Sequence, residues 1–476
     1  MGPVTLGNLH CPPTICPGCD RLLPDFVKVR PDKACPDWYA HCSDAKWGTM
    51  PECELSSFES TGSGAQASPD VDDARRAIER CHELLSDAGD VSGERLANEA
   101  LTAYQALSGA SLNSFFGLLA SQFSPDPDLV EKWADAYRQH PSPEVLGELQ
   151  RAVEPPRQEL FRRLNLASAG TATLIEMRRR ILRGQDAYPP WAAVADDMAH
   201  LLRSWFNGGF LEFRRIDWRT PPAVLDNIIK YEAVHEIRDW RELRRRLQDD
   251  RRCFGLFHPA LRDEPLVFIE LALTRGLSAK VQPLLDPDSA VVDPASCHYA
   301  VFYSISSCHE GLRGVTFGNA LIRRAVNSLG REFPRLKTFA TLSPVPGFRA
   351  WLTGAARDGD RSSAEIVASL DKSGEGVPSA ELQKHLVPKC ASYLLFAKRG
   401  HEPADPVARF HLSNGARLER LNWMGDTSAA GIGRSAGLTA NYLYKLSEIE
   451  RNHQDYVAGR KVVASRRVER LVHETH

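Results

Sequence analysis

One stretch of this sequence, residues 302–348, predicts a complete strand–turn–helix–strand unit. It starts within an apolar, β-type run at residues 299–305, and a glycine-punctuated turn follows. After the turn, apolar side chains recur three or four residues apart, as in an amphipathic helix, at Leu321, Ile322, Ala325, Val326 and Leu329. A second short strand at 338–342 then leads into a loop, Ser-Pro-Val-Pro-Gly, that its prolines make rigid.

The turn between this strand and this helix predicts an anion site. Its residues are Arg313, Gly314, Val315, Thr316, Phe317, Gly318 and Asn319. The first N–H groups of a helix have no partner inside the helix, and glycines let the backbone approach a ligand closely. The R-x-x-G-x-G spacing lacks the Gly-Lys-Ser/Thr ending of a P-loop. It fits the turn with which GNAT acyltransferases hold the pyrophosphate of coenzyme A, although an ordinary strand-to-helix turn has the same pattern.

Three ordered blocks of the sequence resemble the malonyl-CoA decarboxylase family. One is the stretch 302–348. The second, at residues 410–444, reads FHLSNGARLERLNWMGDTSAAGIGRSAGLTANYLY. The third lies within 202–274 and includes SWFNGGFLEFRRIDW, YEAVHEIRDW and RRCFGLFHPAL. The resemblance covers residues 202–476 closely, fits the preceding helical segment more loosely, and does not reach the first 70 residues.

The resemblance implies a fold, a reaction and a site. The fold would be α/β, a GNAT-like mixed sheet whose central strands splay around the coenzyme, preceded by an all-α helical bundle that takes part in homo-oligomer assembly. The reaction would be the carboxy-lyase step from malonyl-CoA to acetyl-CoA and CO2, in malonate breakdown or in control of fatty-acid synthesis. By motif, the catalytic serine and histidine fall at Ser343 and His411, and the coenzyme turn falls on residues 313–319.

The residues around Ser343 and His411 permit this chemistry without requiring it. Ser343 ends a strand on a rigid loop, where its hydroxyl can face a substrate or can cap its own turn. His411 is expected at a strand end, because Asn414-Gly415 is a strong hairpin signal. A surface or core histidine would give the same pattern. Three further polar candidates without an assigned role are Tyr303, Asn422 and Tyr442.

Decarboxylation of a malonyl thioester leaves an enolate on the thioester carbonyl. That carbonyl accepts the electron pair, so we expect that no cofactor is required. The protein must stabilise the oxyanion and protonate the α-carbon. We expect Ser343 to hydrogen-bond the malonyl group and His411 to act as proton donor or oxyanion partner, with the pantetheine arm along the strand that contains Ile305.

The chain divides into three predicted parts. Residues 1–70 hold six of the eleven cysteines and end in a Ser/Gly/Asp-rich linker, and residues 71–201 read as short helices. Residues 202–476 read as the α/β catalytic domain. In the first part, Cys16, Cys19, Cys35 and Cys42 are candidates for a zinc site, since Cys16 and Cys19 form a C-x-x-C pair. A weakly structured extension explains the same cysteines.

Several local patterns predict further features. A half-buried strand is expected at 210–216, strands at 252–258 and 265–274, and helices at 224–229 and 240–247. Residues 354–387 are expected to form a helical insertion over the cleft. The arginines Arg178, Arg179, Arg180 and Arg183 are expected on a solvated helix face.

Two other motifs in the chain are weaker. Residues 433–437 match the G-x-S-x-G nucleophile elbow, and residues from 431 match G-x-G-x-x-A. Both motifs need a strand immediately before them, and none is predicted there. A loop that lines the acyl pocket is the preferred interpretation of these residues.

Overall charge and hydropathy limit the partners and the location. The formal net charge of −2 gives no sign of a nucleic-acid surface, and no apolar run reaches the length of a membrane helix. No signal peptide or peroxisomal address is recognised, so the cytoplasm is expected. The alternatives to a decarboxylase are a CoA-dependent N-acyltransferase, which would use the same turn, and a non-catalytic CoA-binding regulator.

Overall fold

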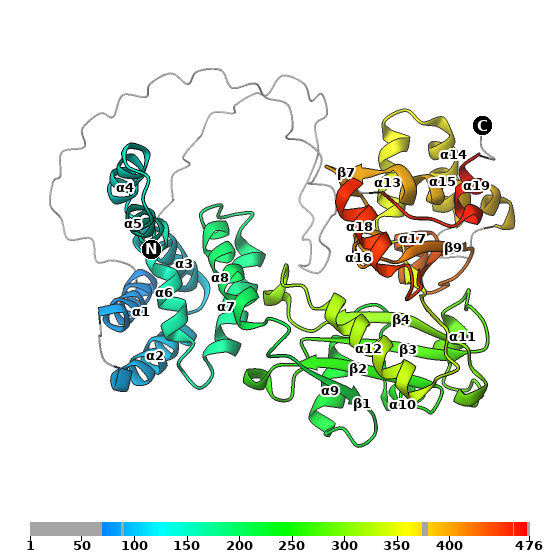
Figure 1. Cartoon of the computed structure of the whole chain (residues 1–476), viewed down its shortest axis with the longest axis horizontal. Helices are drawn as coiled ribbons and strands as arrows, with labels where there is room; N and C mark the ends of the chain where they lie inside the picture. Colours follow the sequence, from blue (N-terminus) through cyan, green and yellow to red (C-terminus); the bar gives the residue numbers. More distant parts are fainter. Residues whose placement is uncertain (1–68, 87–89, 374–378, 460, 474–476) are drawn as a thin grey trace, which may run out of the picture. The chain divides into compact units, whose positions relative to one another are not determined.

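The computed structural model describes residues 69–86, 90–373, 379–459 and 461–473 (Figure 1). The zinc candidates Cys16, Cys19, Cys35 and Cys42 lie outside the described residues. What the sequence predicts for that segment therefore stays a prediction.

Residues 69–205 form helices, as the sequence predicts. In chain order they are α1 (Pro69–Ser86), α2 (Asp90–Gln105), α3 (Gly109–Gln122), α4 (Pro127–Gln139), α5 (Pro143–Val153), α6 (Pro156–Leu164), α7 (Gly170–Gly184) and α8 (Trp191–Trp205). The apolar sides of six of them, α1, α2, α3, α6, α7 and α8, share one buried cluster, which contains Phe115, Phe116 and Trp191. Short helices around a shared core are typical of a bundle.

A capping residue followed by a proline marks the start of several of these helices. Asp126 caps α4, accepting hydrogen bonds from the N–H groups of Asp128 and Leu129, and Pro127 stands at the first helical position. Ser142 accepts from Val145 N–H at the start of α5 in the same way. The first helical position needs no N–H donor, so proline is favourable there.

One mixed sheet follows the helices. Its strands are β1 (Glu212–Ile216), β2 (Arg251–Phe257), β3 (Val267–Thr274), β4 (Tyr299–Ser307), β5 (Thr338–Thr341), β6 (Ser343–Pro344), β9 (Arg417–Asn422) and β10 (Thr439–Tyr444). The order is β1-β2-β3-β4-β5-β10-β6, with β9 also paired to β10. The β4–β5 pair is parallel and the other pairs of this sheet are antiparallel. The predicted mixed sheet after a helical region is thus confirmed.

The centre of the sheet opens between β4 and β5. The two strands pair only from Tyr299 to Phe302 on β4 and from Thr338 to Thr341 on β5. Beyond Phe302, β4 continues to Ser307 beside β3 alone, and its register shifts at the bulge opposite Glu270. The expected separation of the central strands is therefore present, and a β-bulge lies where they part.

Helices cover both faces of the sheet. They include α9 (Pro222–Tyr231), α10 (Trp240–Arg246) and α12 (Gly318–Glu332). The apolar side of α12 packs Leu321 and Leu329 into the cluster that holds Ile269 of β3. The adjacent residue Phe268 points to the opposite face and packs with Leu243 of α10, as the alternation of side chains along a strand requires.

The remaining α-helices are α11 (Gln282–Leu285), α13 (Phe348–Arg357), α14 (Arg361–Ser373), α15 (Ala380–Phe396), α16 (Pro406–Ser413), α17 (Ala429–Ser435), α18 (Ile449–Gly459) and α19 (Arg466–His473). The described part of the insertion at 354–387 is helical, as predicted. Its expected position over the cleft is wrong, because the cavity described below is lined by other elements. Among the described residues, no helix combines the length and the apolar character needed to cross a membrane.

Candidate active site

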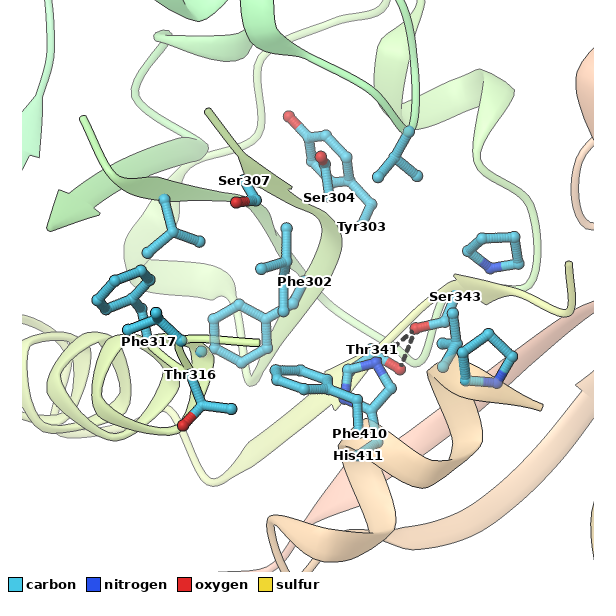
Figure 2. A pocket seen from close by; sticks show the side chains of 18 residues that line it. Phe302, Tyr303, Ser304, Ser307, Thr316, Phe317, Thr341, Ser343, Phe410 and His411 are labelled. Atoms are coloured by element: carbon cyan, nitrogen blue, oxygen red, sulfur yellow. Dashed lines mark hydrogen bonds between the residues drawn. The ribbon is translucent and has the colours of Figure 1, made fainter. Parts of the chain in front are cut away.

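A cavity of about 380 Å³ lies where β4 and β5 separate. Its walls come from residues 302–305 of β4, the turn residues 315–318, β6 and the helix α16. Figure 2 shows Thr316 and Phe317 on one side of the cavity and Ser343 with His411 on the other. The structure thus brings the predicted coenzyme turn and the predicted Ser/His pair to one cavity.

Ser343 is held rigidly at this cavity. It is buried in β6, and its hydroxyl donates to Thr341 Oγ1 at 2.9 Å. The following residues are fixed as well, because Val345 N–H donates to Ser435 Oγ and Gly347 N–H donates to the carboxylate of Asp405. The Ser343 hydroxyl therefore faces the cavity from a backbone with little freedom.

His411 lies on a helix, so its predicted position at a strand end is wrong. It belongs to α16, whose first turn is capped by Asp405 through the N–H groups of Val407 and Ala408. Asp405-Pro406 starts a helix here, where the sequence predicts a strand. Asn414-Gly415 ends that helix, and Gly415 has a φ of +78°, which suits a helix C-terminus as well as a turn.

Two hydrogen bonds orient the His411 ring. Its Nε2 lies 3.1 Å from Ser343 Oγ, and its Nδ1 lies 2.8 Å from the hydroxyl of Tyr444. Because the Ser343 proton is directed at Thr341, the Ser343 oxygen accepts from His411. The proton of the neutral ring is then on Nε2, and Nδ1 accepts from Tyr444. His411 thus presents an N–H donor to Ser343 at the wall of the cavity.

Burial keeps His411 uncharged. Desolvation in the apolar interior lowers the pKa of His411 to about 3. Burial likewise raises the pKa of Tyr444, so its hydroxyl remains protonated. At neutral pH the Ser343–His411 pair is therefore a neutral hydrogen-bonding system.

The three further polar candidates lie at different distances from this pair. Tyr442 stacks on the His411 ring, with 4.8 Å between the ring centroids. Tyr303 lines the cavity, and its buried hydroxyl has no hydrogen-bond partner in the structure. Asn422 donates to Thr439 and Asn441 and so belongs to the pairing of β9 with β10.

The predicted coenzyme turn has the expected backbone. Gly314 has a φ of +85°, a conformation that favours glycine. A Cβ on Gly318 would lie 2.4 Å from the Phe410 ring, so glycine also permits close packing at the start of α12. The side chain of Arg313 is exposed and pairs with Glu310. Asn319 lies within the first turn of α12.

The arginines of α7 differ in environment. Arg179 and Arg180 pair with Glu176, and the exposed Arg183 pairs with Glu310. The prediction of a solvated face is wrong for Arg178, which is 5% exposed. Its guanidinium donates to three backbone carbonyls, of Ala195, Gly311 and Arg313.

A buried polar network that no sequence motif indicates lies behind the cavity. Glu232 accepts hydrogen bonds from Ser304 and Ser306 of β4. Arg246 Nη1 donates to Glu270 at 2.7 Å, and Arg246 Nη2 donates to the carbonyl of His235 at 2.7 Å. This network fixes the segment that carries Val234, a residue of the cavity wall. Only the coincidence of a buried-strand glutamate with an arginine-rich helix could have suggested it.

The weaker motifs are placed elsewhere. Ser435 of the G-x-S-x-G match is buried in α17 and supports Val345. The prediction that the segment 431–437 lines the acyl pocket is wrong, since this segment packs behind β6 rather than into the cavity. Within the described part of the chain, no group of three or more His, Cys, Asp or Glu residues could hold a metal.

Family models match two parts of the chain. The model described as the malonyl-CoA decarboxylase C-terminal domain matches residues 209–476, and the model described as the malonyl-CoA decarboxylase N-terminal domain matches residues 123–206. A mitochondrial malonyl-CoA decarboxylase from Anser anser anser is 33% identical over 79% of this chain and 82% of the relative. The corresponding protein from Rattus norvegicus, also named mitochondrial, is 34% identical over 68% of this chain and 72% of the relative.

Solved structures match the fold as well. Malonyl-CoA decarboxylase from Rhodopseudomonas palustris superposes with a TM-score of 0.79 at 44% identity, over 83% of this chain and 99% of that chain. Malonyl-CoA decarboxylase from Agrobacterium vitis gives a TM-score of 0.78 at 44% identity with the same coverage.

Proposed function

Since this chain belongs to the malonyl-CoA decarboxylase family, we propose that Ser343 and His411 remove CO2 from malonyl-CoA and leave acetyl-CoA. The observation that carries the assignment of these residues is their hydrogen bond, with 3.1 Å between Ser343 Oγ and His411 Nε2, at the wall of the cavity. The same cavity reaches the turn at the start of α12.

The coenzyme would bind along this cavity. Its pyrophosphate would accept hydrogen bonds from the backbone N–H groups of residues 316–319, where the helix dipole favours negative charge. The N–H groups of Arg313 and Val315 already donate to the carbonyls of Glu310 and Leu312. The pantetheine arm would pass Phe302 and Ile305 on β4, both of which line the cavity. This path leads the malonyl group to Ser343 and His411.

The chemistry needs neutral hydrogen-bond donors rather than a charge. As CO2 leaves, the negative charge moves from the carboxylate to the thioester oxygen. On substrate binding, His411 Nε2–H and the Ser343 hydroxyl would exchange their present partners, Ser343 Oγ and Thr341 Oγ1, for that oxygen. Both donors would then stabilise it in a site shielded from water. The thioester carbonyl accepts the electron pair itself, so we propose that no cofactor takes part.

The α-carbon then takes a proton. His411 Nε2–H would give its proton to the α-carbon, and the electron pair of the enolate would form the new C–H bond. Nδ1 would take the hydroxyl proton of Tyr444, which hydrogen-bonds it at 2.8 Å. Tyr444 also lines a second, small cavity of about 60 Å³. Solvent would return the proton there, so that one proton is consumed in each turnover.

The direct test is acetyl-CoA release from malonyl-CoA by the purified protein, with EDTA present and no acceptor amine. Steady turnover is the expected result. Bound acetyl-CoA without turnover would contradict the proposal and would favour an acyltransferase or a non-catalytic CoA-binding protein.

The low pKa of His411 predicts a pH profile. The neutral ring is the active form, and it is lost only as the pH falls toward about 3. We therefore expect kcat/KM for malonyl-CoA to stay level from about pH 5 to 8, without the acid limb near pH 6.5 that an unperturbed histidine gives. Thermal melting at each pH is the control for unfolding. A fall in kcat/KM between pH 7 and 6 that is present in the wild type and absent in His411→Asn would contradict this role.

Tyr444→Phe tests the hydrogen bond at Nδ1. Without the hydroxyl, nothing holds the ring proton on Nε2, and proton return slows. We expect kcat to fall about tenfold to a hundredfold, the KM to change little, and the solvent deuterium isotope effect on kcat to rise. Tyr456→Phe, at a buried tyrosine of α18, is the matched control. If Tyr444→Phe keeps kcat within twofold, the proposed relay is wrong.

Assembly and location complete the proposal. We propose a homo-oligomer formed through the helices of residues 69–205 and a cytoplasmic location. Light scattering of the full chain would test the first, because a monomer mass at all concentrations contradicts it. Cell fractionation would test the second, and the mitochondrial names of the curated relatives make this test necessary.

A further inference from the structure

Four arginines surround the predicted coenzyme turn. Arg178 and Arg183 come from α7, Arg203 comes from α8, and Arg313 belongs to the turn itself. Burial lowers the pKa of Arg178, and the nearby positive charges of Arg203 and Arg313 lower it further. Like charges therefore gather at this place although they repel one another.

The acidic partners leave this charge only partly balanced. Glu310 pairs with both Arg183 and Arg313. The exposed Arg203 forms no ion pair with a carboxylate among the described residues, and its Nε lies 3.4 Å from the carbonyl oxygen of Gly314. Its two terminal nitrogens are thus available beside the turn.

The helix α7 holds the turn in place beside Arg203. Arg178 Nη1 donates to the carbonyls of Gly311 at 2.6 Å and Arg313 at 2.9 Å. A Cβ on Gly311 would lie 1.9 Å from the carbonyl oxygen of Ile175, so helix and turn meet backbone to backbone. Arg178 Nε also donates to the carbonyl of Ala195 on α8, so the same arginine links the helix that carries Arg203 to the turn.

We propose that Arg203, a residue of the helical segment, binds a phosphate group of coenzyme A. A guanidinium with free N–H groups and no acidic partner matches a phosphate dianion or diester. The inference rests on the proposed coenzyme site. It adds that the helical segment takes part in recognising the coenzyme.

Two phosphates could supply this chemistry, the pyrophosphate and the adenosine 3′-phosphate. Three thioesters separate them: malonyl-CoA, malonyl-3′-dephospho-CoA and malonyl-pantetheine, which has no phosphate. For Arg203→Gln we expect kcat/KM on malonyl-CoA to fall about tenfold through KM, with kcat retained. On malonyl-pantetheine the variant and the wild type should be equal. A loss that persists on the dephospho thioester assigns the pyrophosphate, and a loss that disappears there assigns the 3′-phosphate.

Acetyl-CoA binding, measured by calorimetry, separates this inference from the proposed function. We expect Arg203→Gln to weaken binding about tenfold and to reduce its dependence on salt. Arg138→Gln, at an exposed arginine of α4 paired with Asp135, is the matched control and should leave binding unchanged. Equal acetyl-CoA affinity in Arg203→Gln and wild type would overturn the inference alone. An equal loss of kcat/KM by Arg203→Gln on malonyl-pantetheine would also overturn the inference, since the effect of the substitution would then be structural. A wild type that binds no acetyl-CoA would overturn the proposed function itself.

Discussion

His411→Asn and Ser343→Ala are each expected to lower kcat for malonyl-CoA about a thousandfold, with acetyl-CoA affinity within about threefold of wild type. The physical reason is that both groups act on charge that develops only after the carboxylate begins to leave. His411 Nε2 lies 3.1 Å from Ser343 Oγ, so the two donors would meet the same oxygen. Removing either leaves that oxygen with fewer donors in a site that excludes water.

Single-turnover and steady-state kinetics would measure this effect, and calorimetry would measure the affinity. His453→Asn is a matched control, because His453 hydrogen-bonds the carbonyl of Ser413 on the outside of α16 and does not line the cavity. It should keep full activity. If both site variants stay within about twofold of wild type, under about 0.5 kcal/mol of barrier, the assigned pair is wrong. The double variant should lose little more than either single variant, since groups that act as a unit are not additive.

Arg246→Met is expected to lower the free energy of unfolding by about 3 kcal/mol at pH 8. Arg246 is 2% exposed and donates both to Glu270 and to the carbonyl of His235. Burial already raises the pKa of Glu270 to about 7, against the opposing charge of Arg246. Without the guanidinium, the pKa of Glu270 rises further, and a buried carboxylate loses its partner.

The same change has a predictable pH dependence. A carboxyl group whose folded-state pKa is raised binds more protons when folded, so its stability contribution is present at low pH and is lost as the pH rises. The free energy of unfolding of Arg246→Met should therefore fall further below that of the wild type between about pH 7 and 9. Urea denaturation at several pH values measures this difference. Arg244→Met, at an exposed arginine of the same helix, is the control. A pH-independent difference would contradict the assigned role of Glu270.

Local sequence was enough for the central unit of this fold. The strand, turn and helix of residues 299–332 follow from hydrophobic period and glycine placement, and each of these signals acts within a few residues. Ser343 follows β5 closely, as the sequence predicts, but the structure places it in the short strand β6, paired with β10, rather than in a loop. The helical character of residues 69–205 followed from the same kind of local signal.

The position of His411 shows where local signals compete. Asn414-Gly415 suits both a hairpin turn and a helix end, since both use a positive φ at glycine. Asp405 caps the start of α16 and so favours the helix over the hairpin. The Asp405-Pro406 pair is itself a helix-start signal, because aspartate caps a helix and proline suits its first position.

The sequence by itself determined the secondary structure around the site and the identity of the residues proposed to act there. Only the tertiary structure decided the environment of those residues. The hydrogen-bond partners of His411, Ser343 and Tyr444, are 68 and 33 residues away from it in the chain. Arg178 donates to the carbonyl of Gly311, which is 133 residues away from Arg178. Burial and hydrogen bonding between such distant segments set the pKa of His411 and the position of the turn, and no local pattern records which distant segments will pack together.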